Sequence, residues 1–263
     1  MNVTMASIFM LVTATSLNSP NLINNYINEI DYKQFKTELQ NKNCNVLSSN
    51  TIQYSLGYVK GDNLNVRKEP NTDSEILDVI SFNKKIKYSN YNKDWLQIKY
   101  NKKIAYVYKK YVSKKKIEYT DYSVPSYSGY KRWMDYQMIT LENSEQKILQ
   151  DEYAYTGKYG IREINGRYCV AIGSHFTTDI GRYFDLILEN GEVIPCILAD
   201  RKADCDTDVD NIFTVHNGCA TEFVVDADTL NNYAKRDGDI SSCNDKWNSP
   251  VKTIRIYNKN IFN

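Results

Sequence analysis

The sequence predicts an all-β protein with minor helix, divided into two small β domains behind an N-terminal segment. Short runs of alternating apolar residues recur along most of the chain and are separated by turn-forming clusters, which is typical of small β domains. The charge is also divided, although the whole chain of 263 residues carries only +1. Residues 54–116 hold 15 Lys/Arg against 6 Asp/Glu, whereas residues 151–263 hold 12 against 18. A basic domain followed by an acidic one indicates different partners.

The N-terminal segment, residues 1–53, is predicted to be a leader followed by a short helical segment. Met5 to Ser16 is an apolar run as long as a signal-peptide core and too short to span a bilayer. No Lys or Arg precedes it, so a signal remnant and an irregular tail both stay open. From Ile23 to Leu47, apolar residues recur with a helical rhythm.

Residues 54–116 are predicted to form a small, strongly bent β barrel. Four strand-like runs, LNVR, KIKYS, WLQIKY and KIAYVY, are separated by turn clusters. The segment resembles a bacterial SH3 domain in three places: Leu64 to Pro70 (LNVRKEP), Asp94 to Tyr100 (DWLQIKY) and Ala105 to Val112 (AYVYKKYV). This resemblance implies attachment to peptidoglycan or its cross-bridges.

Within this SH3-like domain, aromatic residues fall into two groups. Trp95 is expected in the core, together with Val107. Tyr91, Tyr106 and Tyr108 are the candidates for a ligand groove, with plain packing as the alternative.

Residues 117–150 are predicted to be a linker and a short helix. Glu118 to Tyr130 is polar, rich in tyrosine and interrupted by proline and glycine. Arg132 to Gln150 carries spaced apolar residues that suit a helix docking on the second domain.

Residues 151–263 are predicted to form the second β domain. Phe184–Leu188 and Val193–Leu198 flank a Glu-Asn-Gly turn and should pair as a hairpin. Asp200 follows the second strand, Phe223–Asp226 forms a third, and Val251–Tyr257 closes the domain.

The order of these parts resembles a six-stranded double-psi β-barrel of the group that contains rare lipoprotein A, the three-aspartate domain and membrane-bound lytic transglycosylase A. His175 and Gly181 match the His and Gly of the rare-lipoprotein pattern, and Ala199-Asp200-Arg201 stands where Asn-Asp-Arg belongs. Asp226 ends a strand as in the three-aspartate pattern. The sequence departs from the group in a longer, acidic insert at Lys202 to Thr221, which puts the fit of the substrate in doubt, and in a missing turn proline.

The resemblance implies cleavage of the MurNAc to GlcNAc bond without water, by one carboxyl group that acts as acid and then as base. Such a group needs a raised pKa. Asp226 is therefore predicted as the acid/base, with Asp200 and His175 shaping its pKa. Substrate contacts are predicted for the tyrosines named above and for three further residues, Lys202, Asp204 and His216. The alternative is that both aspartates only accept turn hydrogen bonds.

Other chemistries have weaker support. Six cysteines permit disulfides, and a Cys-His peptidase would use Cys169 or Cys219, yet no nucleophile motif accompanies either. The alternating aspartates from Asp204 to Asp210 lack the glycine and glutamate of a calcium loop. No metal or cofactor is therefore predicted.

The sequence thus predicts a peptidoglycan-acting protein, extracellular or associated with the wall of a Gram-positive cell. Peptidoglycan is the expected partner, with no nucleic acid and no stable membrane span, and no oligomeric state is indicated. The rival prediction, from another class, is a non-catalytic wall-binding or envelope-structural protein.

Overall fold

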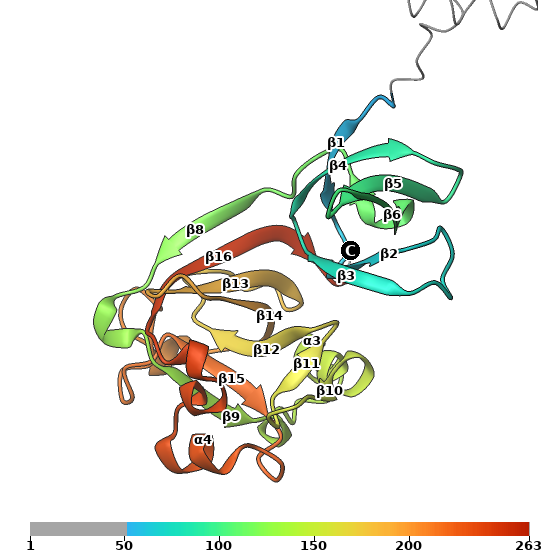
Figure 1. Ribbon diagram of the computed structural model, residues 1–263. Helices are drawn as coiled ribbons and strands as arrows, with labels where there is room; N and C mark the ends of the chain where they lie inside the picture. Colours follow the sequence, from blue (N-terminus) through green and yellow to red (C-terminus); the bar gives the residue numbers. More distant parts are fainter. Residues whose placement is uncertain (1–51, 263) are drawn as a thin grey trace, which may run out of the picture. The chain divides into compact units, whose positions relative to one another are not determined.

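The computed structural model describes residues 52–262, and the chain from Tyr54 onward groups into one unit. The predicted signal-peptide run at Met5 to Ser16 and the helical rhythm at Ile23 to Leu47 lie outside the described residues. Within them the protein is mostly β, with two sheets and a few short helices (Figure 1).

The first sheet has seven strands in the spatial order β3-β2-β6-β5-β4-β1-β7. Its strands are β1 (Ser55–Val59), β2 (Asn63–Arg67), β3 (Ile76–Ser81), β4 (Lys85–Asn90), β5 (Trp95–Tyr100), β6 (Lys103–Tyr108) and β7 (Val112–Ser113). All four predicted runs are confirmed as strands of this sheet. Their apolar residues alternate into one core, in which Leu64, Val66 and Val107 are almost fully buried.

The second sheet has the order β10-β11-β12-β14-β13-β16-β8, and β15 joins it by pairing with β12 and β9. Its strands are β8 (Tyr119–Ser123), β9 (Lys131–Asp135), β10 (Tyr155–Thr156), β11 (Arg162–Ile164), β12 (Arg167–Ile172), β13 (Arg182–Leu188), β14 (Val193–Arg201), β15 (Thr221–Val225) and β16 (Val251–Asn260). The predicted hairpin is confirmed as β13 and β14, with Leu186 opposite Ile194.

The predicted third strand and the predicted closing strand are also found, as β15 and β16. However, the pairings of the described strands do not join β10 to β8, nor β3 to β7, so neither of the predicted closed barrels is found among them. The all-β class is confirmed, and the double-psi arrangement stays a prediction.

The segment expected as a linker instead supplies two strands of the second sheet. β8 pairs antiparallel with β16, and β9 pairs in parallel with β15. Lys131 is 1% exposed because its ammonium donates to the carbonyl oxygen of Ser249 at 2.8 Å. The sequence predicted a helix from Arg132 onward, and the structure corrects this prediction, since Lys131–Asp135 is a strand. The charge of Lys131 is satisfied internally, so a lysine can begin a buried strand.

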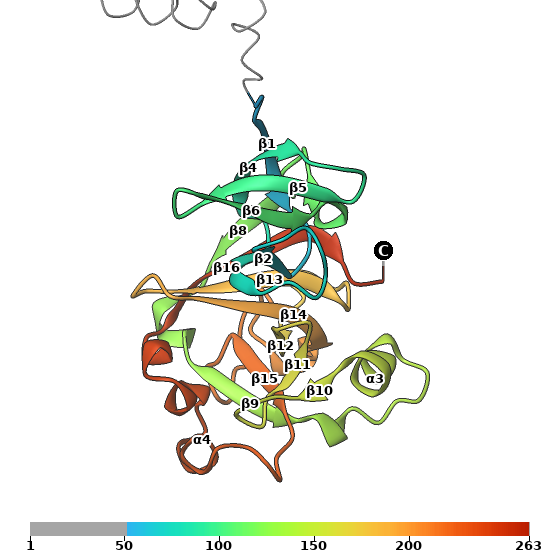
Figure 2. The same cartoon turned by 45° about the vertical axis from the view of Figure 1, so that its right-hand side comes forward.

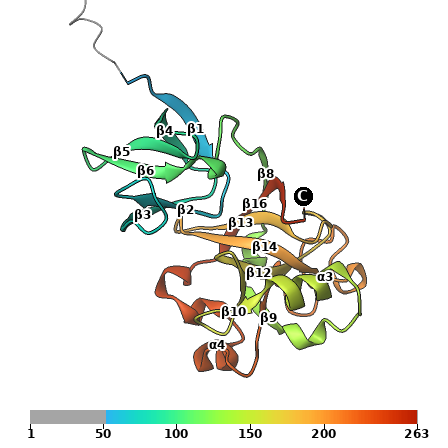
Figure 3. The same cartoon turned by 90° about the vertical axis from the view of Figure 1, so that its right-hand side faces the viewer.

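The two α-helices are short and lie at separate places beside the second sheet (Figure 3). The α-helices are α3 (Glu145–Ile148) and α4 (Asn232–Asp237). The 3-10 helices are η1 (Lys109–Tyr111), η2 (Ser126–Ser128), η3 (Tyr136–Met138), η5 (Asp204–Asp206), η6 (Ile240–Cys243) and η7 (Asp245–Trp247), and η4 (Leu149–Tyr153) is a π-helix. The predicted short helix corresponds only to α3 and η4. Among residues 52–262, no helix has the length and apolar character to cross a membrane.

Strand β12 is the centre of the second sheet. One edge pairs in parallel with β14, and the other pairs antiparallel first with β11 and then with β15. β9, β15, β12 and β14 therefore lie in succession (Figure 2). Every residue of β12 from Cys169 to Ile172 is at most 1% exposed, as expected for a central strand.

Candidate functional site

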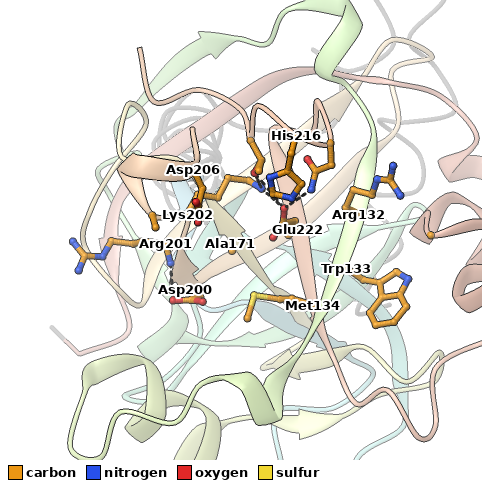
Figure 4. Close-up of a pocket in the computed structure, with 14 residues that line it drawn as sticks. Arg132, Trp133, Met134, Ala171, Asp200, Arg201, Lys202, Asp206, His216 and Glu222 are labelled. Carbon is orange, nitrogen blue, oxygen red and sulfur yellow. Dashed lines mark hydrogen bonds and ion pairs between the residues drawn. The ribbon is translucent and has the colours of Figure 1, made fainter. Parts of the chain in front are cut away.

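A pocket of about 460 Å³ opens over the row of strands β14, β12, β15 and β9. Its volume lies in the range of small-ligand sites, roughly 300–1,000 Å³. Most of its polar groups come from β14, β15 and the loop between them (Figure 4). The residues that line it are Arg132, Trp133, Met134, Ala171, Asp200, Arg201, Lys202, Ala203, Asp206, Thr214, His216, Asn217, Glu222 and Gly238.

Four of these residues form one row across the strands. Ala171 on β12 is opposite Asp200 on β14 and opposite Glu222 on β15, and Glu222 is opposite Arg132 on β9. Opposed residues on neighbouring strands present their side chains on the same face. With strands about 4.8 Å apart, the Cα atoms of Asp200 and Glu222 are about 10 Å apart, and the small Ala171 leaves room between them.

A β-bulge at Ala199 brings Asp200 into this row. Val170 is opposite Leu198, but the next residue, Ala171, is opposite Asp200, so Ala199 is an extra residue in β14. In a regular ladder Ala199 would face Ala171 and Asp200 would turn to the other face. Bulges commonly re-aim a side chain next to an active site, and here the bulge gives two carboxyl groups one face.

The first carboxyl group, Glu222, is held by a buried ion pair. The Lys202 ammonium donates to Glu222 Oε1 at 2.5 Å and to Thr214 Oγ1 at 2.7 Å. The same Oε1 accepts from Asn217 Nδ2 at 3.3 Å and from the Cys219 thiol at 3.2 Å. Burial alone would raise the pKa of Glu222, but the Lys202 charge and these hydrogen bonds outweigh it and lower that pKa. Glu222 is therefore ionised at neutral pH.

The second carboxyl group, Asp200, has the opposite environment. Burial raises the pKa of Asp200, and the negative charge of Glu222 adds to the effect. The Arg201 backbone N–H, which donates to Asp200 Oδ1 at 2.8 Å, opposes the shift without cancelling it. One pocket thus contains a carboxyl group whose pKa is raised and another whose pKa is lowered, and opposite shifts of this kind separate acid from base roles.

The loop between β14 and β15 closes one side of the pocket and contributes His216 and Asn217. It packs directly on the end of β12, because a Cβ atom on Gly173 would lie 1.9 Å from the carbonyl oxygen of Asn211. Any side chain at Gly173 would displace this loop. A Cβ atom on Gly238 would lie 2.7 Å from the Arg132 guanidinium, so a side chain at position 238 would displace that guanidinium.

Among the predicted site residues, Asp200, Lys202 and His216 line this pocket. Asp226 does not. It follows β15 four residues after Glu222, about 13 Å along the strand direction. Its carboxylate accepts the backbone N–H of Asp228 at 3.1 Å and the Thr156 hydroxyl at 3.4 Å. The structure therefore does not bring Asp226 together with Asp200, and the contacts of Asp226 are those of an aspartate that shapes a turn.

His175 and Asp204 also lie outside the pocket lining. The imidazole of His175 packs edge-on against Tyr122 and Phe176, with ring centroids 5.7 and 5.1 Å away. The Asp204 carboxylate accepts from the Ser174 hydroxyl at 2.7 Å. Lys202 is inside the pocket, but its ammonium is occupied by Glu222 and Thr214, so it supports the site rather than offering a free charge.

The three predicted tyrosines lie together on the first sheet. Tyr91 packs edge-on against Tyr106 at 4.9 Å, and Tyr108 packs against Trp95 at 5.3 Å. Tyr91 is 50% exposed, whereas Trp95 is 7% exposed and Val107 is buried, as expected for core residues. Tyr91 and Tyr106 therefore offer an aromatic surface, and their role in binding stays a prediction.

Sequence reasoning missed Glu222 and Arg132. Glu222 stands second in a strand read as apolar, three residues after Cys219, and nothing in its local pattern marks it. Arg132 was placed in a helix. The signal for both is their register with Asp200, which only long-range strand pairing provides.

The cysteines in the described part of the chain are free thiols: Cys169, Cys196, Cys205, Cys219 and Cys243. Burial raises the pKa of Cys169 and of Cys219 to about 12, which keeps both thiols protonated. These environments count against the Cys-His peptidase alternative. In the acidic loop, the Asp208 carboxylate accepts hydrogen bonds from the backbone N–H groups of Ile212 and Phe213, so this carboxylate stabilises the turn.

Comparison with known families identifies the first sheet. Residues 62–113 match the bacterial SH3 domain family, and the match does not extend to the second sheet. The first sheet is therefore a bacterial SH3 domain, a class that suggests binding to the cell wall. No curated protein matches the chain significantly.

Proposed function

We propose that this chain is a cell-wall protein whose second sheet cleaves the glycan strands of peptidoglycan by lytic transglycosylase chemistry. The observation that carries the proposal is the pair Asp200 and Glu222, which share one pocket and whose pKa values move in opposite directions. The proposal keeps Asp200 from the sequence prediction and assigns the acid/base role to it instead of Asp226.

The proposed chemistry uses one carboxyl group twice. The protonated Asp200 donates its proton to the glycosidic oxygen between MurNAc and GlcNAc as that bond breaks. The resulting Asp200 carboxylate then accepts the proton of the MurNAc C6 hydroxyl, whose oxygen closes the 1,6-anhydro ring. No water is consumed, and Asp200 returns to its protonated form.

Glu222 has an electrostatic role in this scheme. Positive charge develops on the sugar ring as the glycosidic bond breaks. The Glu222 carboxylate faces the same pocket and stays ionised, so it stabilises that charge. Lys202 fixes the carboxylate in place, which reduces the reorganisation needed during the reaction.

The remaining assignments rest on the family resemblance of each part. The double-psi arrangement is proposed for the second sheet because its order of strands and aspartates resembles that group. The SH3 domain is proposed to attach the protein to the wall, with Tyr91 and Tyr106 in contact with it. With this attachment, the protein is proposed to act outside the cell or in the wall of a Gram-positive organism. The chemistry needs no cofactor.

A non-catalytic wall-binding protein is the second candidate, and one observation favours it. The Glu222 Oε1 atom receives four donors. A carboxylate with so many donors is also what a purely structural role requires, in which Glu222 fixes the conformation of the loop that contains His216.

Digestion of purified sacculi, followed by mass spectrometry of the soluble products, tests the proposal. The wild-type protein should release anhydro-muropeptides and Asp200→Asn should not. Asp226→Asn is the matched control, since it makes the same chemical change outside the pocket and should retain release. Loss of release in Asp226→Asn, with Asp200→Asn still active, would return the acid/base role to Asp226. Wild-type protein that binds sacculi without releasing product would establish the second candidate.

A further inference from the structure

The SH3 domain and the second sheet meet along a seam built from two loops of the first sheet. The Asp62 carboxylate, between β1 and β2, accepts from Arg167 Nε at 3.3 Å and from the Tyr183 hydroxyl at 3.0 Å. Phe82, between β3 and β4, is 8% exposed and packs edge-on against Tyr257 at 5.0 Å. These contacts make the seam an ordered part of the protein.

Two adjoining hollows follow this seam. One has a volume of about 380 Å³ and the other about 770 Å³. Both are lined by Asp62 and Asn63 from the first sheet and by Asn165 and Gly166 from the second. The shared lining makes them neighbours on either side of one contact rather than separate sites.

The acidic groups of the seam are already neutralised. Asp62 faces Arg167, and Lys259 Nζ lies 3.7 Å from it. Asp185 accepts from Arg167 Nη1 at 3.1 Å and from the Tyr257 hydroxyl at 2.6 Å. Arg255, which lines the smaller hollow, is paired with Asp121 at 2.7 Å. None of these groups leaves a negative charge to balance further cations.

Four lysines around the hollows have no acidic partner among the residues that the structure describes. Lys84 and Lys116 line the smaller hollow, and Lys60 and Lys110 line the larger one. None of the four forms an ion pair with any residue in the 52–262 range. Like charges held around one groove raise the local concentration of anions. The groove therefore favours a ligand that brings several negative charges.

We propose that this seam binds a linear phosphate polymer, which runs through both hollows and contacts Lys60, Lys84, Lys110 and Lys116. Lysine ammonium groups bind phosphate as point charges without demanding a fixed geometry, which suits a flexible polymer. Each of the two adjoining hollows has two lysines that form no ion pair within residues 52–262, although Lys110 and Lys116 also lie over tyrosine rings. This arrangement matches a repeating anion better than a single small one. The proposal is independent of the glycan-cleaving role, because the seam residues lie outside the pocket of Asp200 and Glu222.

Binding of the full chain to inorganic polyphosphate, measured by titration calorimetry at several salt concentrations, tests the proposal. Each lysine contact with an anionic partner contributes about five-fold in affinity. The double variants Lys84→Gln/Lys116→Gln and Lys60→Gln/Lys110→Gln should therefore each weaken binding roughly 25-fold. Each should also reduce the slope of log K against log salt by about 1.4, at about 0.7 per lost contact.

The matched control is Lys85→Gln/Lys87→Gln, on exposed positions of β4 that do not line the hollows. It removes the same charge from the same domain and should leave affinity within about three-fold, because long-range attraction is screened. Equal losses in control and seam variants would overturn the proposal, as would an effect of only one seam pair.

Two further arms identify the source of the phosphate. Sacculi that retain their phosphodiester polymers should retain more protein than sacculi stripped of them with hydrofluoric acid, and Lys84→Gln/Lys116→Gln should abolish that difference. Tighter binding to single-stranded DNA than to polyphosphate, at equal phosphate concentration, would make the seam a nucleic-acid site and refute the proposal.

Discussion

Replacement of Glu222 by glutamine tests whether the pocket depends on the buried ion pair. The Lys202 side chain is 2% exposed and that of Glu222 is 19% exposed, so neither charge is well solvated. Glu222→Gln keeps an oxygen acceptor and the shape of the side chain, but it removes the negative charge that contacts the ammonium. Lys202 then has no anionic partner, and its ammonium is left with neutral acceptors: the amide oxygen, Thr214 Oγ1 at 2.7 Å and the Cys219 sulfur at 3.4 Å.

The expected loss follows from two limits. Leaving a buried charge without its partner reduces stability by about 3–5 kcal/mol. Losing a hydrogen bond to a charged group reduces it by about 1.5–3 kcal/mol. Because the amide oxygen of glutamine still accepts from Lys202, we expect about 3 kcal/mol for Glu222→Gln. The double variant Lys202→Met/Glu222→Gln removes both charges and should recover to within about 1 kcal/mol of the wild type.

Urea unfolding of the wild type, both single variants and the double variant, with a common m-value, gives the coupling free energy of the pair. The pH dependence provides a second test. Since the folded state lowers the pKa of Glu222, its contribution is present above the ordinary pKa of 4.5 and is lost as the pH falls through the folded value. A loss below about 1 kcal/mol in Glu222→Gln, or additive effects in the double variant, would refute the reasoning.

Three further predictions concern aspartates in different surroundings. Burial raises the pKa of Asp200, so its ionisation opposes folding; Asp200→Asn should raise the free energy of unfolding at pH 7, and the gain should vanish below pH 3.8 in denaturant titrations. Asp226→Asn should instead lower stability by about 1 kcal/mol, since Asp228 N–H and the Thr156 hydroxyl lose a charged acceptor; an unchanged midpoint would contradict the turn role. Asp62→Ala should reduce stability by about 1–3 kcal/mol and increase hydrogen exchange in the Phe82 turn, because Arg167 and Tyr183 lose a partner; exchange confined to the β1–β2 loop would argue against a coupled seam.

Local patterns were sufficient for several strands and for the SH3 domain, because alternation and turn chemistry act over a few residues. The run Trp95 to Tyr100 became β5, and the Glu-Asn-Gly turn joined β13 to β14 as expected. The same reasoning failed for β3, whose exposed apolar residues Ile76 and Val79 break the alternation. It also failed for β9, where a buried lysine and an arginine made a strand look like part of a helix.

The candidate site shows why the sequence could single out Asp200 and Asp226 as a pair, whereas the structure places Glu222, and not Asp226, in one pocket with Asp200. Both Asp200 and Asp226 follow apolar strands, so by sequence they are equivalent. Two features of the strand pairing separate them. The extra residue at Ala199 moves Asp200 by one position relative to β12. The antiparallel direction of β15 places Glu222 opposite Ala171 and carries Asp226 away from Asp200. A single inserted residue reverses which face a side chain occupies, and no local propensity records it. The second carboxyl group of such a site must therefore be found from register, by asking which residue of the next strand lies opposite the same small neighbour.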